Sequence, residues 1–253
     1  MIEIQNLTFE YAPNQAVFEK FSWSVGRGEA WAILGPSGCG KSTLLYLLAG
    51  LRIPINGVVK VDGQVLTRPR PQSGLIIQDY GLLPWATVRQ NAELGMDIRR
   101  FYGPDGKHAP KESKPVPIDV SPWLVRLGLL EQAEKFPGQL SGGQRQRTAI
   151  ARTLALQPDL LLMDEPFSSL DAPTRESLQQ LVLELWREQD LTLVVVTHSI
   201  EEAAMLGQHI LLLKTPPNIN AQVIANPKMS QVNFRNSMDY QALCHDLRER
   251  MLA

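Results

Sequence analysis

The sequence has few cysteines, no excess of either charge and no long hydrophobic run. Its 253 residues include two cysteines, Cys39 and Cys244, which are too few for a disulfide framework. Lys and Arg total 25 against 26 Asp and Glu, so no overall basic charge points to nucleic acid as a partner. The most hydrophobic runs, 160–163 and 191–196, fall far short of the about 18 residues that a membrane-spanning helix needs.

The composition is that of a globular domain, with 44% hydrophobic and 20% charged residues. Glu3 stands where a signal peptide would need an apolar core. Together with the scarcity of cysteine, this predicts a cytoplasmic, reducing location. The segment 103–122 is rich in Pro and Lys, and we expect it to form an exposed loop.

A glycine-rich segment follows an apolar run at 30–34. Residues 35–43 read GPSGCGKST, which matches G-x-x-x-x-G-K-[ST] between a strand-like and a helix-like sequence. Backbone N–H groups of such a loop surround phosphates, and Lys41 would neutralise their oxygens while Ser42 binds Mg²⁺. The alternative is a plain turn entering a helix. The predicted nucleotide-binding set of this loop is Gly35, Pro36, Ser37, Gly38, Cys39, Gly40, Lys41, Ser42 and Thr43.

A second apolar run, 160–163, ends in the adjacent acids Asp164 and Glu165. A continuous apolar run of this kind is typical of a parallel strand covered on both faces. We expect Asp164 to hold Mg²⁺ through water. Glu165, pointing the other way on an extended chain, would reach a water in line with the γ-phosphate. Two acids after a strand can also mark nothing more than the end of the strand. Because the same chain contains the glycine-rich loop, we favour a role for these acids in binding Mg²⁺ and water.

Residues 140–144, LSGGQ, precede a helix-like segment and the second acidic strand. This combination resembles the signature of ATP-binding cassette (ABC) ATPases. Ser141 and Gln144 also have the spacing of a capping box, so an ordinary capped helix is the alternative. The resemblance implies a head-to-tail dimer in which one copy closes on the γ-phosphate of the other. The residues that would make this contact are Ser141, Gly142, Gly143 and Gln144.

Other elements occur in the order that the resemblance implies. Tyr11 resembles the aromatic residue that stacks on adenine, and Gln78 the glutamine that senses Mg²⁺ and water. Asp171, within 169–171, resembles the loop that crosses the dimer interface. His198 resembles the histidine that contacts the γ-phosphate. Taken singly, Tyr11 could be a core or edge-strand residue, and a lone histidine after a strand is more often structural.

The resemblance covers residues 1–213 and implies an α/β fold with Mg-dependent ATPase activity. We expect a parallel core sheet, an N-terminal antiparallel sheet with Tyr11 and 58–65, and a helical subdomain at about 82–156, within one domain, 1–253. A helix at about 238–252 should pack on this domain, or else on a dimer partner. In catalysis Glu165 would be the general base, while Lys41, Gln78, His198 and the second copy's signature stabilise the transferred charge.

The segment 79–91 indicates which process the ATPase powers. Leu82, Leu83 and Trp85 are strongly apolar for a loop, and Thr87 and Gln90 form another possible capping box. In ABC transporters this region accepts a coupling helix of a membrane subunit. The alternative is that these residues fold back into the helical subdomain. The LLPW pattern resembles ATPases of nitrate, sulfonate and taurine importers.

We therefore expect the ATPase subunit of an importer for a small organic or inorganic anion. It would bind ATP and Mg²⁺, form a dimer with itself, and bind a separate permease through the groove near Leu82, Leu83 and Trp85, peripherally on the cytoplasmic face of the inner (plasma) membrane. An extracytoplasmic solute-binding protein would serve that permease, and no nucleic acid would take part. An exporter ATPase and a soluble ABC ATPase of a protein-assembly system are the alternatives. Ser199, where relatives usually have Asp, departs from the family pattern.

Overall fold

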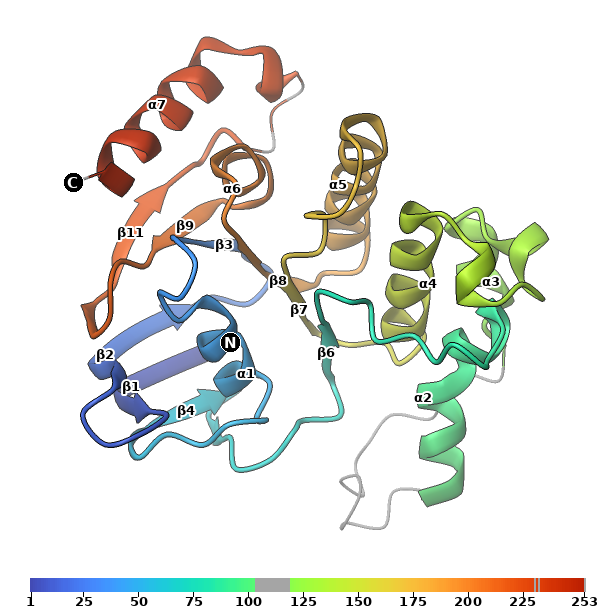
Figure 1. Cartoon of the computed structure of the whole chain (residues 1–253), viewed down its shortest axis with the longest axis horizontal. Helices are drawn as coiled ribbons and strands as arrows, with labels where there is room; N and C mark the ends of the chain where they lie inside the picture. The colour runs from blue at the N-terminus through green and yellow to red at the C-terminus, as the bar shows by residue number, and fades with distance from the viewer. Residues whose placement is uncertain (103–118, 230, 232, 253) are drawn as a thin grey trace.

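The computed structural model describes residues 1–102, 119–229, 231 and 233–252. Its centre is a six-stranded sheet in the order β11-β9-β3-β8-β7-β6 (Figure 1). All neighbours pair in parallel except β11, which runs antiparallel to β9. Every residue of β3, β7 and β8 is buried, as a parallel sheet flanked by other layers requires. The strands are β3 Ala30–Leu34, β6 Ser73–Ile76, β7 Leu160–Asp164, β8 Thr192–Thr197, β9 His209–Leu212 and β11 Gln222–Ala225.

A second sheet has the order β10-β2-β1-β4-β5. Its strands are β1 Ile2–Glu10, β2 Ala16–Val25, β4 Asn56–Val61, β5 Gln64–Val65 and β10 Asn218–Asn220. The predicted antiparallel sheet is confirmed for β1, β2, β4 and β5, whereas β10 adds a parallel edge to β2. The segment 58–65 lies in this sheet as expected, and a turn at Asp62 and Gly63, both with positive φ, connects β4 to β5 within it. The expectation that Tyr11 belongs to this sheet is wrong, because β1 ends at Glu10 and Tyr11 is the next residue.

Some helices pack on the six-stranded sheet, and others form a separate group beside it. Figure 1 shows α2, α3 and α4 together at one end of the molecule and α7 at the other. Among the described helices, none is long and apolar enough to cross a bilayer. The α-helices are α1 Lys41–Leu48, α2 Val88–Tyr102, α3 Ser121–Arg126, α4 Gly142–Leu154, α5 Ala172–Glu188, α6 Ile200–Leu206 and α7 Met238–Leu252; short 3₁₀ helices occupy Leu130–Gln132, Pro137–Gln139 and Phe234–Asn236.

The expected loop at 103–122 lies mostly outside the described residues. Its last two residues contradict the expectation, because Ser121 and Pro122 form the first turn of α3. Asp119 accepts a hydrogen bond from the Ser121 N–H at 2.8 Å. Proline suits this position, since the N–H that it lacks would have no partner within the helix.

The C-terminal helix α7 packs its apolar stripe on this chain. Cys244 and Leu247 are buried, and Leu247 belongs to a cluster with Ala32 and Leu34 of β3. The Tyr240 ring meets Phe234 edge-on, with 5.6 Å between ring centroids. The helix therefore supports the central sheet, and the contact is within one chain.

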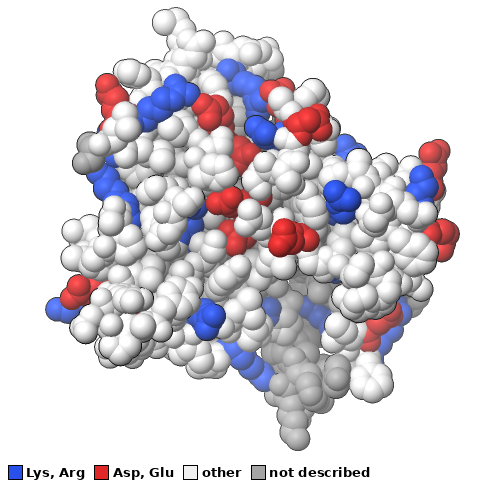
Figure 2. Space-filling view, viewed as in Figure 1, with Lys and Arg blue, Asp and Glu red and all other residues white. Residues whose placement is uncertain are grey.

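Charge is mixed over the surface that faces the viewer in Figure 2, with no broad patch of one sign. Acidic side chains gather near the middle of that face. In the same view in Figure 1, the middle is where β7 and β8 end.

Truncating Leu247 should destabilise the fold. The side chain is 0% exposed, so we expect Leu247→Ala to lower the free energy of unfolding by about 2–5 kcal/mol through lost burial and a cavity. The matched control is Leu252→Ala, because Leu252 is on the same helix and 89% exposed. Urea unfolding followed by circular dichroism measures both. Equal midpoints for the two variants would show that α7 does not pack here in solution.

Candidate nucleotide-binding site

The glycine-rich loop connects β3 to α1 and curls around the Lys41 side chain. Lys41 is 5% exposed, and its Nζ donates to the Gly35 and Pro36 carbonyl oxygens at 2.9 Å each. Gly40, which precedes α1, has a φ of 104°, and a Cβ there would come within 2.5 Å of Val17. Glycine is required at this position because other residues strain at such a φ. The loop therefore holds a buried cation against two of its own carbonyl oxygens.

A cavity of about 320 Å³ lies against this loop, within the usual size range of small-molecule sites. Tyr11 stands at its edge, 56% exposed, with its hydroxyl 3.0 Å from Thr43 Oγ1. The Arg52 guanidinium lies over the Tyr11 ring, 5.7 Å from the centroid. The lining residues are Tyr11, Val17, Ser37, Gly38, Gly40, Lys41, Ser42, Thr43 and Glu165.

The hydroxyl of Ser42 meets the carboxylate of Asp164 behind the cavity. Ser42 Oγ donates to Asp164 Oδ1 at 2.9 Å. Burial raises the pKa of Asp164, while hydrogen bonds from Ser42 and Tyr46 oppose the rise. Sequence reasoning missed Tyr46. The available signal was its spacing, four residues after Ser42, which places both side chains on one face of α1.

These groups fit a magnesium ion. Mg²⁺ prefers oxygen ligands and usually takes one or two from the protein, with the rest from water and phosphate. Ser42 and Asp164 supply a hydroxyl and a carboxylate in contact with each other. No cluster of three or more His, Cys, Asp or Glu that could hold a metal occurs in the described part of the chain. Gln78 lies exposed two residues after β6 ends.

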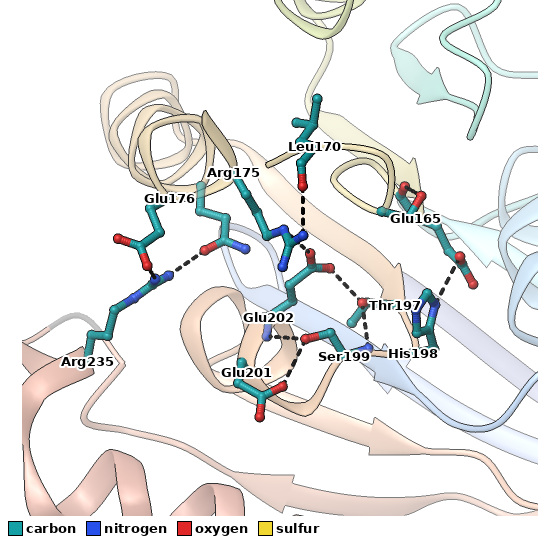
Figure 3. Close-up of polar contacts among 12 residues, drawn as sticks. Glu165, Leu170, Arg175, Glu176, Thr197, His198, Ser199, Glu201, Glu202 and Arg235 are labelled. Carbon is teal, nitrogen blue, oxygen red and sulfur yellow. Dashed lines mark hydrogen bonds and ion pairs between the residues drawn. The ribbon is translucent and has the colours of Figure 1, made fainter. Parts of the chain in front are cut away.

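Glu165 and His198 form a pair at the edge of the sheet. Glu165 Oε2 is 3.1 Å from His198 Nδ1 (Figure 3). The expectation of an extended chain at Glu165 is wrong, because its φ is 43°. The chain already turns there: Ser168 N–H donates to the Glu165 carbonyl oxygen at 3.3 Å. A left-handed non-glycine residue costs about 1–3 kcal/mol and is common in active sites. The Glu165 side chain still lines the cavity.

The LSGGQ segment forms the predicted capping box but lies apart from the cavity. Ser141 N–H donates to Gln144 Oε1 at 2.9 Å, and Gln144 N–H donates to Ser141 Oγ at 3.2 Å. Asp171 caps α5 in a similar way, accepting from Thr174 N–H at 3.2 Å. Neither Ser141 nor Asp171 lines the cavity. A single chain therefore does not bring these two residues together with the glycine-rich loop.

The segment before α2 leaves one large apolar side chain in the open. Trp85 is 73% exposed, whereas Leu82 packs against the largest buried cluster. The alternative of folding back thus holds for Leu82 and not for Trp85. The predicted capping box is present, with Thr87 N–H donating to Gln90 Oε1 at 2.9 Å and Gln90 N–H to Thr87 Oγ1 at 3.3 Å.

Asn91 holds this segment in place, a role that sequence reasoning did not find. The side chain is 0% exposed. Its Nδ2 donates to three carbonyl oxygens, and its Oδ1 accepts from Leu83 N–H at 2.8 Å. A buried amide with this many partners ties Leu83, Ala86 and Thr87 to the first turn of α2. Trp85 therefore lies in a loop, residues 83–87, that the Asn91 side chain holds in place.

Comparison with known proteins identifies the family. A family model described as ABC transporter matches residues 18–168. The taurine import ATP-binding protein TauB of Pseudomonas aeruginosa is 42% identical over 216 residues, 85% of this chain and 78% of that protein. The aliphatic sulfonates import ATP-binding protein SsuB of Bacillus subtilis is 38% identical, covering 94% of this chain and 86% of that protein. The bicarbonate transport ATP-binding protein CmpD of Synechocystis is 35% identical, covering 93% and 81%.

A solved structure agrees in fold. It is described as the dimeric structure of a post-hydrolysis state of the ATP-binding cassette MJ0796 bound to ADP and Pi. It is 29% identical, covers 89% of this chain and 99% of its own, and has a TM-score of 0.73. The α/β cassette fold and the resemblance inferred from the motifs are confirmed. Since the family model matches more than half of its residues, the chain belongs to the ABC transporter family.

Proposed function

We propose that this chain hydrolyses ATP to energise import of a small anionic solute through a separate permease. The observation that carries the proposal is the Glu165 carboxylate, which lines the phosphate-loop cavity while paired with His198. The solute class follows from relatives named for the import or transport of taurine, aliphatic sulfonates and bicarbonate.

ATP would lie along the cavity from Tyr11 to Glu165. The Tyr11 ring offers adenine a stacking surface at the exposed edge. Backbone N–H groups of 35–43 would receive the phosphates, and Lys41 Nζ would exchange its two carbonyl partners for phosphate oxygens. Ser42, Asp164 and Gln78 would hold Mg²⁺, which supplies positive charge beside the transferred phosphoryl group.

Glu165 would accept the proton of the attacking water. With this carboxylate ionised, His198 Nδ1 must carry a hydrogen to bond with Glu165 Oε2 at 3.1 Å. The Nε2 of the histidine would then serve to orient the water or to bind a γ-phosphate oxygen. Positioned proton transfer of this kind contributes about 10²–10⁴-fold to rate. Lys41 and Gln78 would stabilise the charge on the transferred group.

A second copy of the chain would complete each site. The Ser141–Gln144 segment and Asp171 are remote from the cavity of their own chain, and the similar MJ0796 cassette is dimeric with ADP and Pi bound. In a head-to-tail dimer, the N-terminus of α4 brings unpaired N–H groups and its dipole to the partner's γ-phosphate. Hydrolysis would then depend on dimer closure.

The loop 83–87, which contains Trp85, would contact the permease. An exposed aromatic residue beside half-buried Leu82 and Leu83 offers an anchor for a short amphipathic helix. The protein would lie peripherally on the cytoplasmic face of the inner membrane. A solute-binding protein on the outer side would deliver the solute to the permease.

Replacing the proposed base should separate binding from hydrolysis. We expect Glu165→Gln to lower kcat about 10²–10³-fold, since the amide cannot accept the proton, while ATP binding persists. Steady-state phosphate release and nucleotide titration measure the two quantities. The control is Glu19→Gln on β2, an exposed glutamate outside the cavity, with unchanged kcat. Turnover equal to wild type in Glu165→Gln would remove Glu165 from the base role.

Introducing a charge at the exposed tryptophan should release the protein from membranes. We expect Trp85→Glu to lose association with permease-containing membranes, because the apolar anchor is gone, and to keep basal ATPase activity. Sedimentation with such membranes measures the bound fraction. Met238→Glu is the control, since Met238 is 86% exposed at the start of α7. Full retention of Trp85→Glu would place the permease contact elsewhere.

Affinity capture tests the importer assignment itself. Tagged Glu165→Gln, with ATP and Mg²⁺, should recover a permease with several membrane-spanning helices from detergent-solubilised native membranes, because blocked hydrolysis keeps the closed dimer on its partner. Mass spectrometry identifies what is bound. Recovery of soluble proteins alone, with ATP-dependent dimerisation intact, would contradict transport and keep the ATPase assignment.

A further inference from the structure

The structure contains an ion pair between half-exposed Arg175 and buried Glu202 that joins two loops of the site. We propose that Glu202 and Arg175 are positioning residues, which hold the loop of His198 and the loop 169–171 in a fixed relation. Through this pair, docking of a second copy at 169–171 alters the placement of His198. The proposal rests on the proposed ATPase function, in which both loops take part.

Glu202 fixes the backbone on both sides of His198. The Thr197 hydroxyl donates to Glu202 Oε2 at 2.6 Å, and the Ser199 N–H donates to Thr197 Oγ1 at 3.0 Å (Figure 3). Thr197 is 2% exposed and Glu202 5% exposed, so water does not compete for these bonds. A single carboxylate on α6 therefore anchors the residues that flank the histidine.

Arg175 reaches the other loop from α5. Its Nη2 donates to the Leu170 carbonyl oxygen at 2.7 Å, while its Nε lies 3.9 Å from Glu202 Oε1. Figure 3 shows the guanidinium between the two, with Leu170 on one side and Glu202 on the other. Leu170 precedes Asp171, the residue that resembles the family's interface loop. The connection therefore runs from 169–171 through Arg175 and Glu202 to His198.

The geometry of the pair leaves room for movement. Arg175 Nε is buried and has no hydrogen-bond partner among the described residues. Direct N–H···O bonds are 2.7–3.2 Å long, so a shift of about 1 Å would close the gap to Glu202. A buried donor without a partner is costly and calls for an explanation. An ion pair that tightens when 169–171 moves provides one.

The electrostatics agree with this geometry. Burial raises the pKa of Glu202, and the Thr197 hydrogen bond and the Arg175 charge oppose that rise. A buried carboxylate costs free energy unless it is bonded and paired. Of the cations in the described chain, Arg175 is the one that ion-pairs with Glu202. Loss of that charge should therefore change the position of the loop that contains His198.

The neighbouring Glu201 provides a matched comparison. It is on the same helix and accepts from Ser199 Oγ at 3.1 Å and from Arg248 of α7 at 2.5 Å. Its side chain is 54% exposed and faces α7, away from Arg175. The Glu201 carboxylate contacts Ser199, which follows His198, and the Glu202 carboxylate contacts Thr197, which precedes it. Of these two glutamates, Glu202 is the one that Arg175 connects to 169–171.

The test compares Glu202→Gln with Glu201→Gln in the full-length protein. Glutamine keeps the size of Glu202 and can accept from Thr197, but removes the charge opposite Arg175. We expect Glu202→Gln to lower kcat for ATP about 10-fold, with KM changed less than about 2-fold, as misplaced catalytic groups do. Glu201→Gln should retain the wild-type kcat. Arg175→Gln should match Glu202→Gln, and the double variant should be no slower than either.

The outcomes separate positioning from a structural role. Unchanged kcat per ATP-binding site in Glu202→Gln, with only a lower unfolding temperature, would overturn the proposal, as would additive losses in the double variant. If Glu202→Gln does not fold, the kcat of Arg175→Gln provides the same test. The Arg175 side chain is 37% exposed, so its replacement should disturb folding less. Wild-type protein without ATP hydrolysis would instead overturn the proposed function, and this inference with it.

Discussion

The register of the central parallel strands is the constraint on which the candidate site depends. Leu34 at the end of β3 pairs with Thr197 at the end of β8, and Asp164 at the end of β7 pairs with Val196. The segments that follow these strands therefore start from the same edge of the sheet. Open α/β sheets bind ligands at this edge because successive loops diverge there. A slip of one residue would remove Glu165 from the reach of His198.

The carboxyl ends of the parallel strands determine which parts of the nucleotide site a single chain brings together. The glycine-rich loop, the acidic pair and the histidine all extend from strand ends of one sheet. Ser141 and Asp171 instead occupy the first turns of α4 and α5 as caps. Their backbones are fixed by local hydrogen bonds before any partner arrives, so a second copy meets an ordered surface and loses little conformational entropy on docking.

Local chemistry was predictable from the sequence, whereas tertiary geometry was not. The glycine-rich loop depends on residues within eight positions of each other and both capping boxes on residues three positions apart, so their spacing predicts them. The left-handed Glu165 could not be inferred, because its backbone is turned by the chain that leaves β7. Arg175 and Glu202 were also missed, since α5 and α6 meet only in the folded chain.

The position of β3 between β8 and β9 also bears on biosynthesis. The strand that leads into the glycine-rich loop emerges early from the ribosome, but both of its neighbours are translated more than 150 residues later. Until then β3 has no parallel partner, and α7 has not yet covered Ala32 and Leu34. Contacts so distant in sequence form late in folding. A nascent chain thus carries the whole phosphate-loop motif for most of its synthesis without a sheet to hold it.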